Sequence, residues 1–141
     1  MPETFRNPDP DAIRALLKSV RTIAVVGLSP NPRRPSHGVS RALQQFGYRV
    51  IPVRPAVDAV LGEKAYPTLA AVAEPFDLVD VFRSPEHVAP LVDECIQLGV
   101  KALWLQDGVI DAAAANRARD AGITVVMDRC IYRDYIALCQ D

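Results

Sequence analysis

The sequence has little of what marks several large classes of protein. Its net charge is only −1, from 16 basic and 17 acidic side chains, and its isoelectric point near 6.1 gives no general attraction to nucleic acid. No apolar run approaches the roughly 20 residues that a membrane helix needs. Half of the residues are hydrophobic, which is unlike a disordered chain. We therefore expect a folded protein with no nucleic-acid or membrane partner.

Cysteine is also scarce. The three cysteines, Cys95, Cys130 and Cys139, are odd in number and form no CxxC pair, which favours reduced cytosolic thiols over disulfides or zinc ligands. The first residues, MPETFRNPDPDA, carry acidic side chains and prolines where a signal peptide would have a basic start and an apolar run. These features predict a cytoplasmic protein.

Catalytic motifs are missing as well. The two histidines, His37 and His87, belong to no HExxH motif, and the chain has no Walker loop, GxSxG elbow or paired carboxylates. Cys130 lies in the first turn of a predicted helix, whose N-terminus would lower the pKa of a thiol, but an apolar strand precedes it. We expect a buried, inert Cys130. We assign no catalytic residue and no metal site.

What the sequence does contain is a regular alternation of apolar strands and amphipathic helices. A chain of 141 residues with this alternation predicts one α/β domain, a Rossmann-like, three-layer sandwich with a five-stranded parallel sheet and helices on both faces. For the strands we expect the order 3-2-1-4-5. The predicted strands are 22–27, 49–53, 76–82, 101–105 and 123–127. The predicted helices are 10–20, 36–46, 69–73, 85–98, 111–121 and 129–139.

Ligands of such sheets bind beyond the carboxyl ends of the strands, beside the first strand. There the chain has Gly27 but not the GxGxxG fingerprint, since Ser29 and Pro32 replace the second and third glycines. The loop can still offer amides and a helix N-terminus to a phosphate, with Ser29 and Ser36 as further donors. A side chain at Gly27 is expected to block the ligand, in a fold that survives if the loop has room for it.

Arginine is the residue that recurs after the predicted strands. An NAD enzyme would have an acidic residue after the second strand, whereas Arg54 suits a ribose phosphate. Phe82 beside Arg83 either forms one wall of an adenine slot or caps the sheet. A sheet edge of this kind predicts a ligand with several negative charges. The arginines concerned are Arg33, Arg34, Arg54, Arg83 and Arg129.

Six motifs in order, TIAVVGLSPNPRRPSHGV, GYRVIPVRP, LGEKAYPTL, DLVDVFR, ALWLQDGV and VVMDRC, carry a family resemblance. Over residues 20–135 the sequence resembles the small stand-alone CoA-binding proteins, which are similar to the CoA-binding domain of the succinyl-CoA synthetase α subunit. The resemblance implies a Rossmann-like domain that binds coenzyme A or an acyl-CoA. It implies no ligase reaction, because the synthetase's second domain and phosphorylated histidine have no counterpart here.

The resemblance also implies roles for particular residues. Gly27, Ser29 and Pro30 would face the phosphates of the ligand, with Arg33, Arg34 and Ser36 nearby. Pro55 would form the turn after the second strand, where this chain has Arg54 in place of the usual asparagine. Phe82 and Arg83 would flank the adenosine, and Gln106 and Gly108 would lie by the pantetheine arm.

Two other functions are open on the sequence alone. One is an NADP-dependent reductase that uses Arg54 for the 2′-phosphate, which the missing GxGxxG and the lack of a proton donor count against. The other is a regulatory module that senses a nucleotide. A homo-oligomer or a partner enzyme is open as well.

Overall fold

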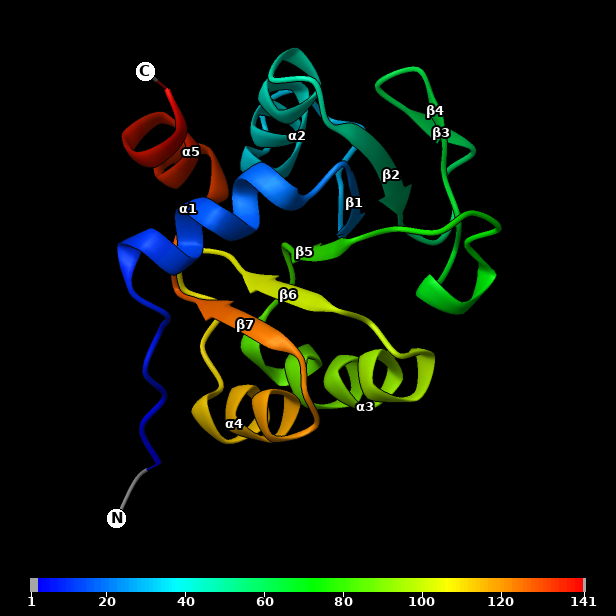
Figure 1. The fold of residues 1–141 in the computed structure, drawn as a ribbon. Coiled ribbons are helices and arrows are strands. Elements are labelled where there is room, and N and C mark those ends of the chain that lie inside the picture. Colours follow the sequence, from blue (N-terminus) through cyan, green and yellow to red (C-terminus); the bar gives the residue numbers. More distant parts are fainter. Residues whose placement is uncertain (1–2, 141) are drawn as a thin grey trace.

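The computed structural model describes residues 3–140, and its centre is a five-stranded parallel sheet between two layers of helices (Figure 1). All residues of the strands Leu78–Val81 and Ala102–Leu105 are buried, as expected for parallel strands covered on both faces. The predicted fold class is confirmed. The strands are β1 (Thr22–Val26), β2 (Arg49–Val53), β5 (Leu78–Val81), β6 (Ala102–Leu105) and β7 (Thr124–Met127).

The helices divide between the two faces of the sheet, as Figure 1 shows. One face packs against α1 (Pro10–Ser19), α2 (Pro35–Gln45) and α5 (Ile131–Cys139). The other packs against α3 (Val88–Leu98) and α4 (Ala112–Asp120). Short 3-10 turns stand at Leu69–Ala71 and Pro85–His87. The predicted helix 69–73 is thus a single turn, and the predicted helix 85–98 begins with one.

The strand order is β2-β1-β5-β6-β7, which is 2-1-3-4-5 for the five parallel strands. The expected order 3-2-1-4-5 is wrong. The third strand pairs with β1, Ile23 opposite Leu78, and not with β2. The connection from β2 therefore crosses back over β1, and β2 becomes an edge strand. An edge also tolerates Pro52, which lacks an amide hydrogen for a second neighbour.

The connection after β2 contains a small hairpin that we did not predict, β3 (Ala59–Val60) and β4 (Glu63–Lys64). The chain then returns to β2, where Arg54 donates its backbone N–H to the Tyr66 carbonyl at 2.8 Å. This bond fixes the backbone directly after β2. The direction in which the Arg54 side chain leaves the sheet edge is set by that backbone.

Helix ends follow local capping rules. The Asp9 side chain accepts from the Ala12 N–H at 2.9 Å, as expected for a cap with Pro10 at the first helical position. Asp111 caps α4 in the same way. The last helix begins at Ile131 and not at 129, because Asp128 has a φ of +60° and Cys130 is extended.

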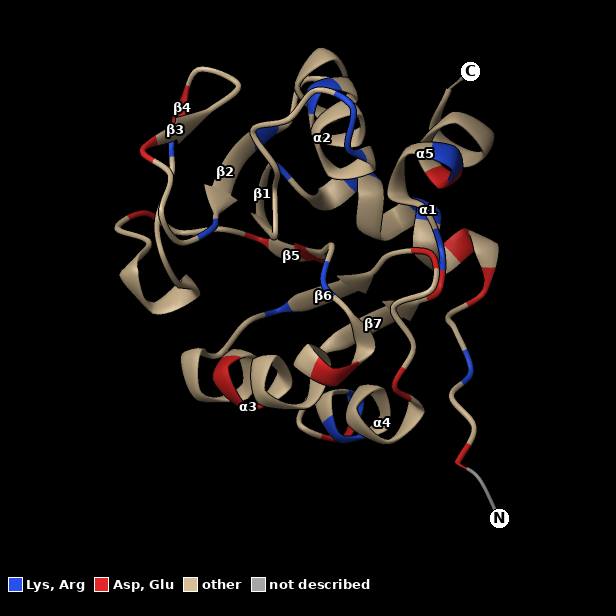
Figure 2. Ribbon diagram, turned by 180° about the vertical axis from the view of Figure 1, so that it is seen from behind, with Lys and Arg blue, Asp and Glu red and all other residues tan. Residues whose placement is uncertain are grey.

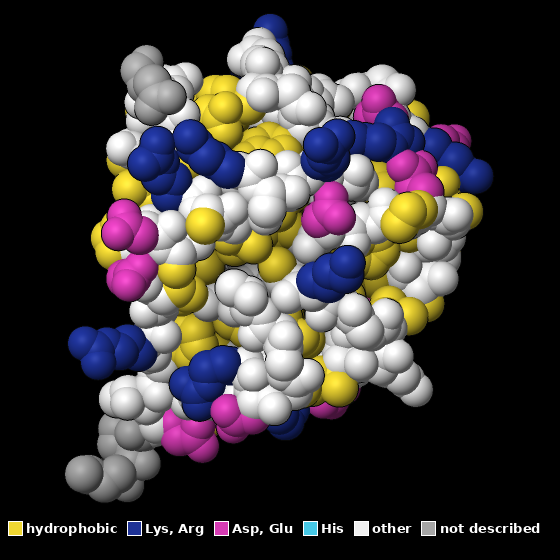
Figure 3. Space-filling view, viewed as in Figure 1, with side chains coloured by type: hydrophobic (Ala, Val, Ile, Leu, Met, Phe, Trp, Pro, Cys, Tyr) yellow, Lys and Arg dark blue, Asp and Glu magenta, His cyan; other side chains and the backbone are white. Residues whose placement is uncertain are grey.

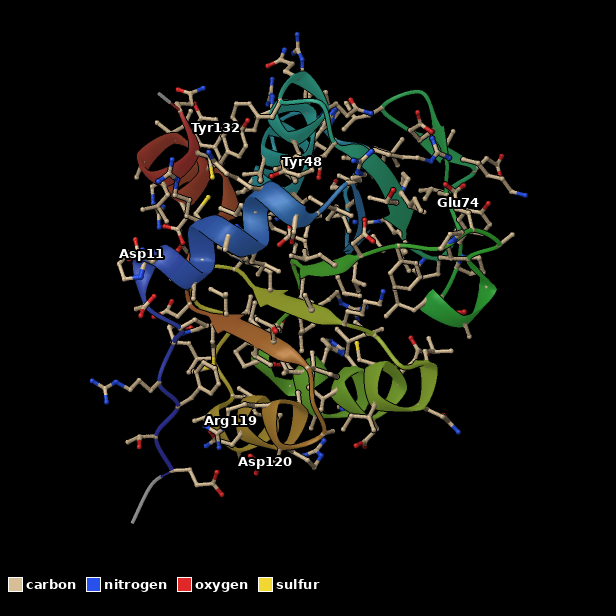
Figure 4. The ribbon with its side chains drawn as sticks, in the orientation of Figure 1. Asp11, Tyr48, Glu74, Arg119, Asp120 and Tyr132 are labelled. Atoms are coloured by element: carbon tan, nitrogen blue, oxygen red, sulfur yellow. The ribbon has the colours of Figure 1, made fainter. Side chains whose placement is uncertain are left out.

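Aromatic side chains join α5 to the end of α2. The rings of Phe46 and Tyr135 stack with centroids 3.9 Å apart, and those of Phe46 and Tyr132 lie 5.9 Å apart. Tyr132 lies between α5 and α2 in Figure 4. These contacts set the position of α5 relative to α2, and the N-termini of both helices lie at the carboxyl edge of the sheet.

Some charges on the face seen in Figure 1 are paired. Figure 3 shows acidic side chains close to the basic ones there, and Arg49 binds Glu63 at 3.1 Å and also pairs with Glu74, which Figure 4 labels. Within residues 3–140 no helix has both the length and the apolar character needed to cross a membrane.

Candidate functional site

The site lies at the carboxyl ends of the neighbouring strands β1 and β5, where the connections that follow these strands go to opposite faces of the sheet. After β1 the chain turns to α2 on one face of the sheet, and after β5 it turns to α3 on the other. The Phe82 N–H donates to the Val26 carbonyl at 2.9 Å, which holds the two strand ends together. A crevice at such a switch point is the usual ligand site of an open parallel sheet.

A cavity of about 550 Å³ opens at this point. A second hollow of about 510 Å³ adjoins it, and the two share Gly27, Arg34, Arg54 and Phe82. We call the two together the cleft. The first hollow is also lined by Ser29, Pro35, Ser36, Val39, Gln106, Asp107, Val109, Cys130 and Arg133. The second is also lined by Pro55, Arg83 and Ser84.

Most of the residues that the sequence analysis selected therefore line one cleft. Four of them line neither hollow: Pro30, Arg33, Gly108 and Arg129. Pro30 and Arg33 are exposed in the β1–α2 loop. Gly108 forms an exposed turn with a φ of +76°, and its N–H donates to Asp128 at 2.8 Å.

The β1–α2 loop is held by its own serines. The Ser29 N–H donates to the Ser36 hydroxyl oxygen at 2.9 Å, and the Asn31 N–H donates to the Ser29 hydroxyl oxygen at 3.0 Å. Both serines are buried. Each hydroxyl thus accepts one bond within the loop and keeps its own hydrogen to donate. The loop enters the cleft in a fixed shape.

Three arginines of the cleft have no carboxylate partner among residues 3–140: Arg34, Arg54 and Arg83. Figure 2 shows basic segments directly after β2 and β5 and before α2, which are the positions of these arginines in the chain. Unpaired guanidinium groups that converge on one cleft favour an anionic ligand, because their charges are not neutralised within the protein.

Arg129, the fifth strand-end arginine, is different. Its guanidinium binds Asp134 through bonds of 2.6 and 2.8 Å, and it does not line the cleft. The hydrogen bond to Asp134 raises the pKa of Arg129. The ion pair thus joins Arg129, which precedes α5, to the first turn of that helix. Its place after a strand is therefore not sufficient to make it a ligand residue.

Gln106 connects β6 to α5 at one end of the cleft. We call this end, which lies beside β6 and α5, the inner end. Its side-chain oxygen accepts from the Ile131 N–H at 3.1 Å, which satisfies one of the first amides of α5. The bond fixes the amide orientation, so the Gln106 NH2 group is the end of the side chain that remains to donate. Cys130, the cap residue of α5, is 7% exposed and lines the same end.

Several lining residues were not selected from the sequence. Pro35, Val39 and Val109 carried no chemical signal. Asp107 lies shortly after β6 and was given no role, and Arg133 lies inside α5. Its spacing of three residues from Cys130 along α5, which puts both at the start of one helix, could have indicated it.

Asp80 is a further unusual residue beside the site. It lies in the middle of β5 between Val25 and Trp104 of the neighbouring strands, and it is 0% exposed. Neither side-chain oxygen has a hydrogen bond of ordinary geometry among residues 3–140, and the nearby Val81 N–H offsets the effect of burial on the carboxyl pKa only in part. Burial raises the pKa of the Asp80 carboxyl well above its usual range.

Accessibility predicts how the thiols react. Iodoacetamide at neutral pH is expected to label Cys139, which is partly exposed, faster than Cys130 or Cys95. Cys130 is almost buried, and burial raises the pKa of Cys95 to about 12. Peptide mapping by mass spectrometry over time measures the three rates, with the urea-unfolded chain as control. If Cys130 were labelled as fast as Cys139, the expectation that Cys130 is inert would be wrong.

An open parallel sheet with a cationic crevice at its switch point defines a Rossmann-like α/β domain of the ligand-binding type. The chain belongs to the family of CoA-binding domains, whose model matches residues 21–135. It is 40% identical over 127 residues to the uncharacterized protein YneT of Bacillus subtilis (strain 168), and the match covers 90% of this chain and 94% of YneT.

Two other proteins are similar to this chain, one in structure and one in sequence. A hypothetical protein from Pyrococcus horikoshii OT3 has a solved structure similar over 99% of this chain and 100% of its own, with a TM-score of 0.90 and 34% identity. Acetate–CoA ligase (ADP-forming) II of Archaeoglobus fulgidus is 28% identical over 83 residues, 57% of this chain and 12% of the ligase. The chain is thus homologous to a small part of that ligase.

Proposed function

We propose that this protein binds coenzyme A or an acyl-CoA in the cleft and catalyses no reaction by itself. The observation that carries the proposal is a group of three arginines, without carboxylate partners among residues 3–140, around the switch-point cleft of a CoA-binding family member. Coenzyme A has a diphosphate and a ribose 3′-phosphate, so it matches a site with several free cations better than a neutral ligand does.

The two hollows suggest how the ligand lies. The diphosphate would bind at the β1–α2 loop, where Arg34 stands directly before α2 and the helix N-terminus adds its positive end. The 3′-phosphate and adenosine would lie toward Arg54, Phe82 and Arg83. The pantetheine arm would then run toward Gln106 at the inner end.

Charge-assisted bonds to the 3′-phosphate are tested with two ligands. CoA is expected to bind more tightly than dephospho-CoA by about 1–3 kcal/mol, which calorimetry measures directly. Arg54→Asn and Arg83→Gln should each reduce this difference. Arg41→Gln is the matched control, since Arg41 is an exposed arginine of α2 that does not line the cleft.

Equal affinities for CoA and dephospho-CoA would show that these arginines do not bind the 3′-phosphate. NADPH is the competing ligand in the same titrations, because Arg54 would suit a 2′-phosphate as well. Tighter binding of NADPH than of CoA would overturn the proposal and favour the reductase alternative.

A further inference from the structure

The two ends of the cleft differ in charge. The hollow between the ends of β2 and β5 holds Arg34, Arg54 and Arg83, none of which has a carboxylate partner among residues 3–140. The first hollow shares Arg34 and Arg54 with it, and beside β6 and α5 the first hollow adds one cation, Arg133, and one carboxylate, Asp107. One end is therefore strongly positive, and the other carries one charge of each sign.

The two charges at the inner end neutralise each other. Arg133 binds both carboxylate oxygens of Asp107, at 2.7 Å each, in the parallel geometry that suits a guanidinium and a carboxylate. The hydrogen bonds to Asp107 raise the pKa of Arg133. Asp107 thus occupies the face of Arg133 that would otherwise receive an anion from the ligand.

The rest of this end is neutral. Val39 and Val109 contribute apolar wall, Cys130 is nearly buried, and Gln106 has its side-chain oxygen already bonded to Ile131. A carbonyl could accept from the Gln106 NH2 group, and an aliphatic chain could lie against the valines. A second carboxylate would find no free cation from β6 or α5, because Asp107 already holds Arg133, and it would approach Asp107.

We propose that the inner end selects CoA thioesters with uncharged acyl groups against those of dicarboxylic acids, and that Asp107 is the residue that excludes the latter. The proposal rests on the proposed function, since it places the phosphates of CoA at the positive end and hence the acyl group at the neutral one. Asp107 acts by its charge and by holding Arg133, not by contact with a reacting atom.

Butyryl-CoA and succinyl-CoA are the probes, because both acyl groups have four carbons and only the second ends in a carboxylate. Calorimetry on the wild-type protein is expected to show about fivefold tighter binding of butyryl-CoA, the size of effect that suits a solvent-exposed charge pair. In Asp107→Asn the ratio of the two affinities should fall to about one or reverse. Asp107→Asn leaves Arg133 free to bind the succinyl carboxylate, which raises the affinity for succinyl-CoA. The double variant Asp107→Asn/Arg133→Gln should lose this increase.

Asp93→Asn is the matched control, because Asp93 is an exposed carboxylate paired with Arg117 on the far helices α3 and α4. It should keep the wild-type ratio. Equal affinities for the two thioesters in the wild type, or an Asp107→Asn ratio equal to that of the wild type, would overturn the inference and leave CoA binding in place. Failure of the wild type to bind CoA at all would overturn the proposed function itself.

Discussion

Gly27→Ala is expected to lower the free energy of unfolding by roughly 2–5 kcal/mol, the sum of backbone strain and of overpacking against the neighbouring strand. Gly27 has a φ of +86°, which L-residues rarely adopt. A Cβ there would overlap the Phe82 carbonyl oxygen and lie 3.0 Å from Cδ of Arg83. Urea denaturation monitored by circular dichroism measures the loss.

Gly108→Ala separates the two causes. Gly108 has a similar φ of +76°, but no atom lies within 4 Å of the Cβ that the change would add. Only the strain is expected there, about 1–2 kcal/mol. Equal destabilisation at both positions would show that Phe82 yields easily and that the close contact at Gly27 has no cost.

This contact also corrects the reason that the sequence suggested for Gly27. We expected a side chain there to block the ligand in an intact fold, if the loop had room. The loop has no room, because β5 passes directly against β1 at this point. Loss of CoA binding in a Gly27 variant is therefore explained by damage to the strand ends, and arginine variants are the better test of the phosphate positions.

Asp80→Asn is expected to abolish a pH dependence of stability. A carboxyl whose pKa is raised by burial binds a proton more tightly in the folded than in the unfolded chain. The folded state then holds more protons above pH 4, so stability falls as the pH rises, by up to about 1.4 kcal/mol per pH unit. The fall continues until the pH passes the folded pKa of Asp80.

Urea denaturation between pH 4 and pH 8 tests this. Asparagine cannot titrate, so the variant should gain on the wild-type protein steadily as the pH rises, whatever its stability at pH 4. Asp120→Asn is the control, since the Asp120 side chain is 70% exposed. Parallel pH profiles for the wild type and Asp80→Asn would mean that Asp80 is ionised in the folded protein or is hydrated there.

Asp80 bears on the site because of its place in the strand. Phe82, which lines the cleft, follows it by two residues and so lies on the same face of the sheet. A charged Asp80 would sit among the apolar side chains that pack below Phe82 and the start of α2. Ionisation of Asp80 should therefore weaken the packing on the face of β5 from which Phe82 reaches the cleft.

The fold was largely predictable because its signals are local. The apolar run of β6 and the capped start of α1 each depend on a few consecutive residues, and both are found in the structure. The hairpin at Ala59–Val60 and Glu63–Lys64 has strands of two residues, too short for any period to be visible. The strand order was wrong because both orders satisfy the same alternation and the same handedness rule.

The sequence by itself determined that the chain forms a parallel α/β sheet with arginines at its carboxyl edge, since side-chain period and strand-end position are properties of short segments. Only the tertiary structure decided which arginines stay free. Arg34 lines the cleft and its neighbour Arg33 does not, while Asp134 neutralises Arg129 and Asp107 neutralises Arg133. Asp107 and Arg133 come from the turn after β6 and from α5, so their pairing depends on how those elements pack, which no local pattern records. Asp134 follows Arg129 by only five residues, and the extended backbone at Cys130 before α5 lets the two meet.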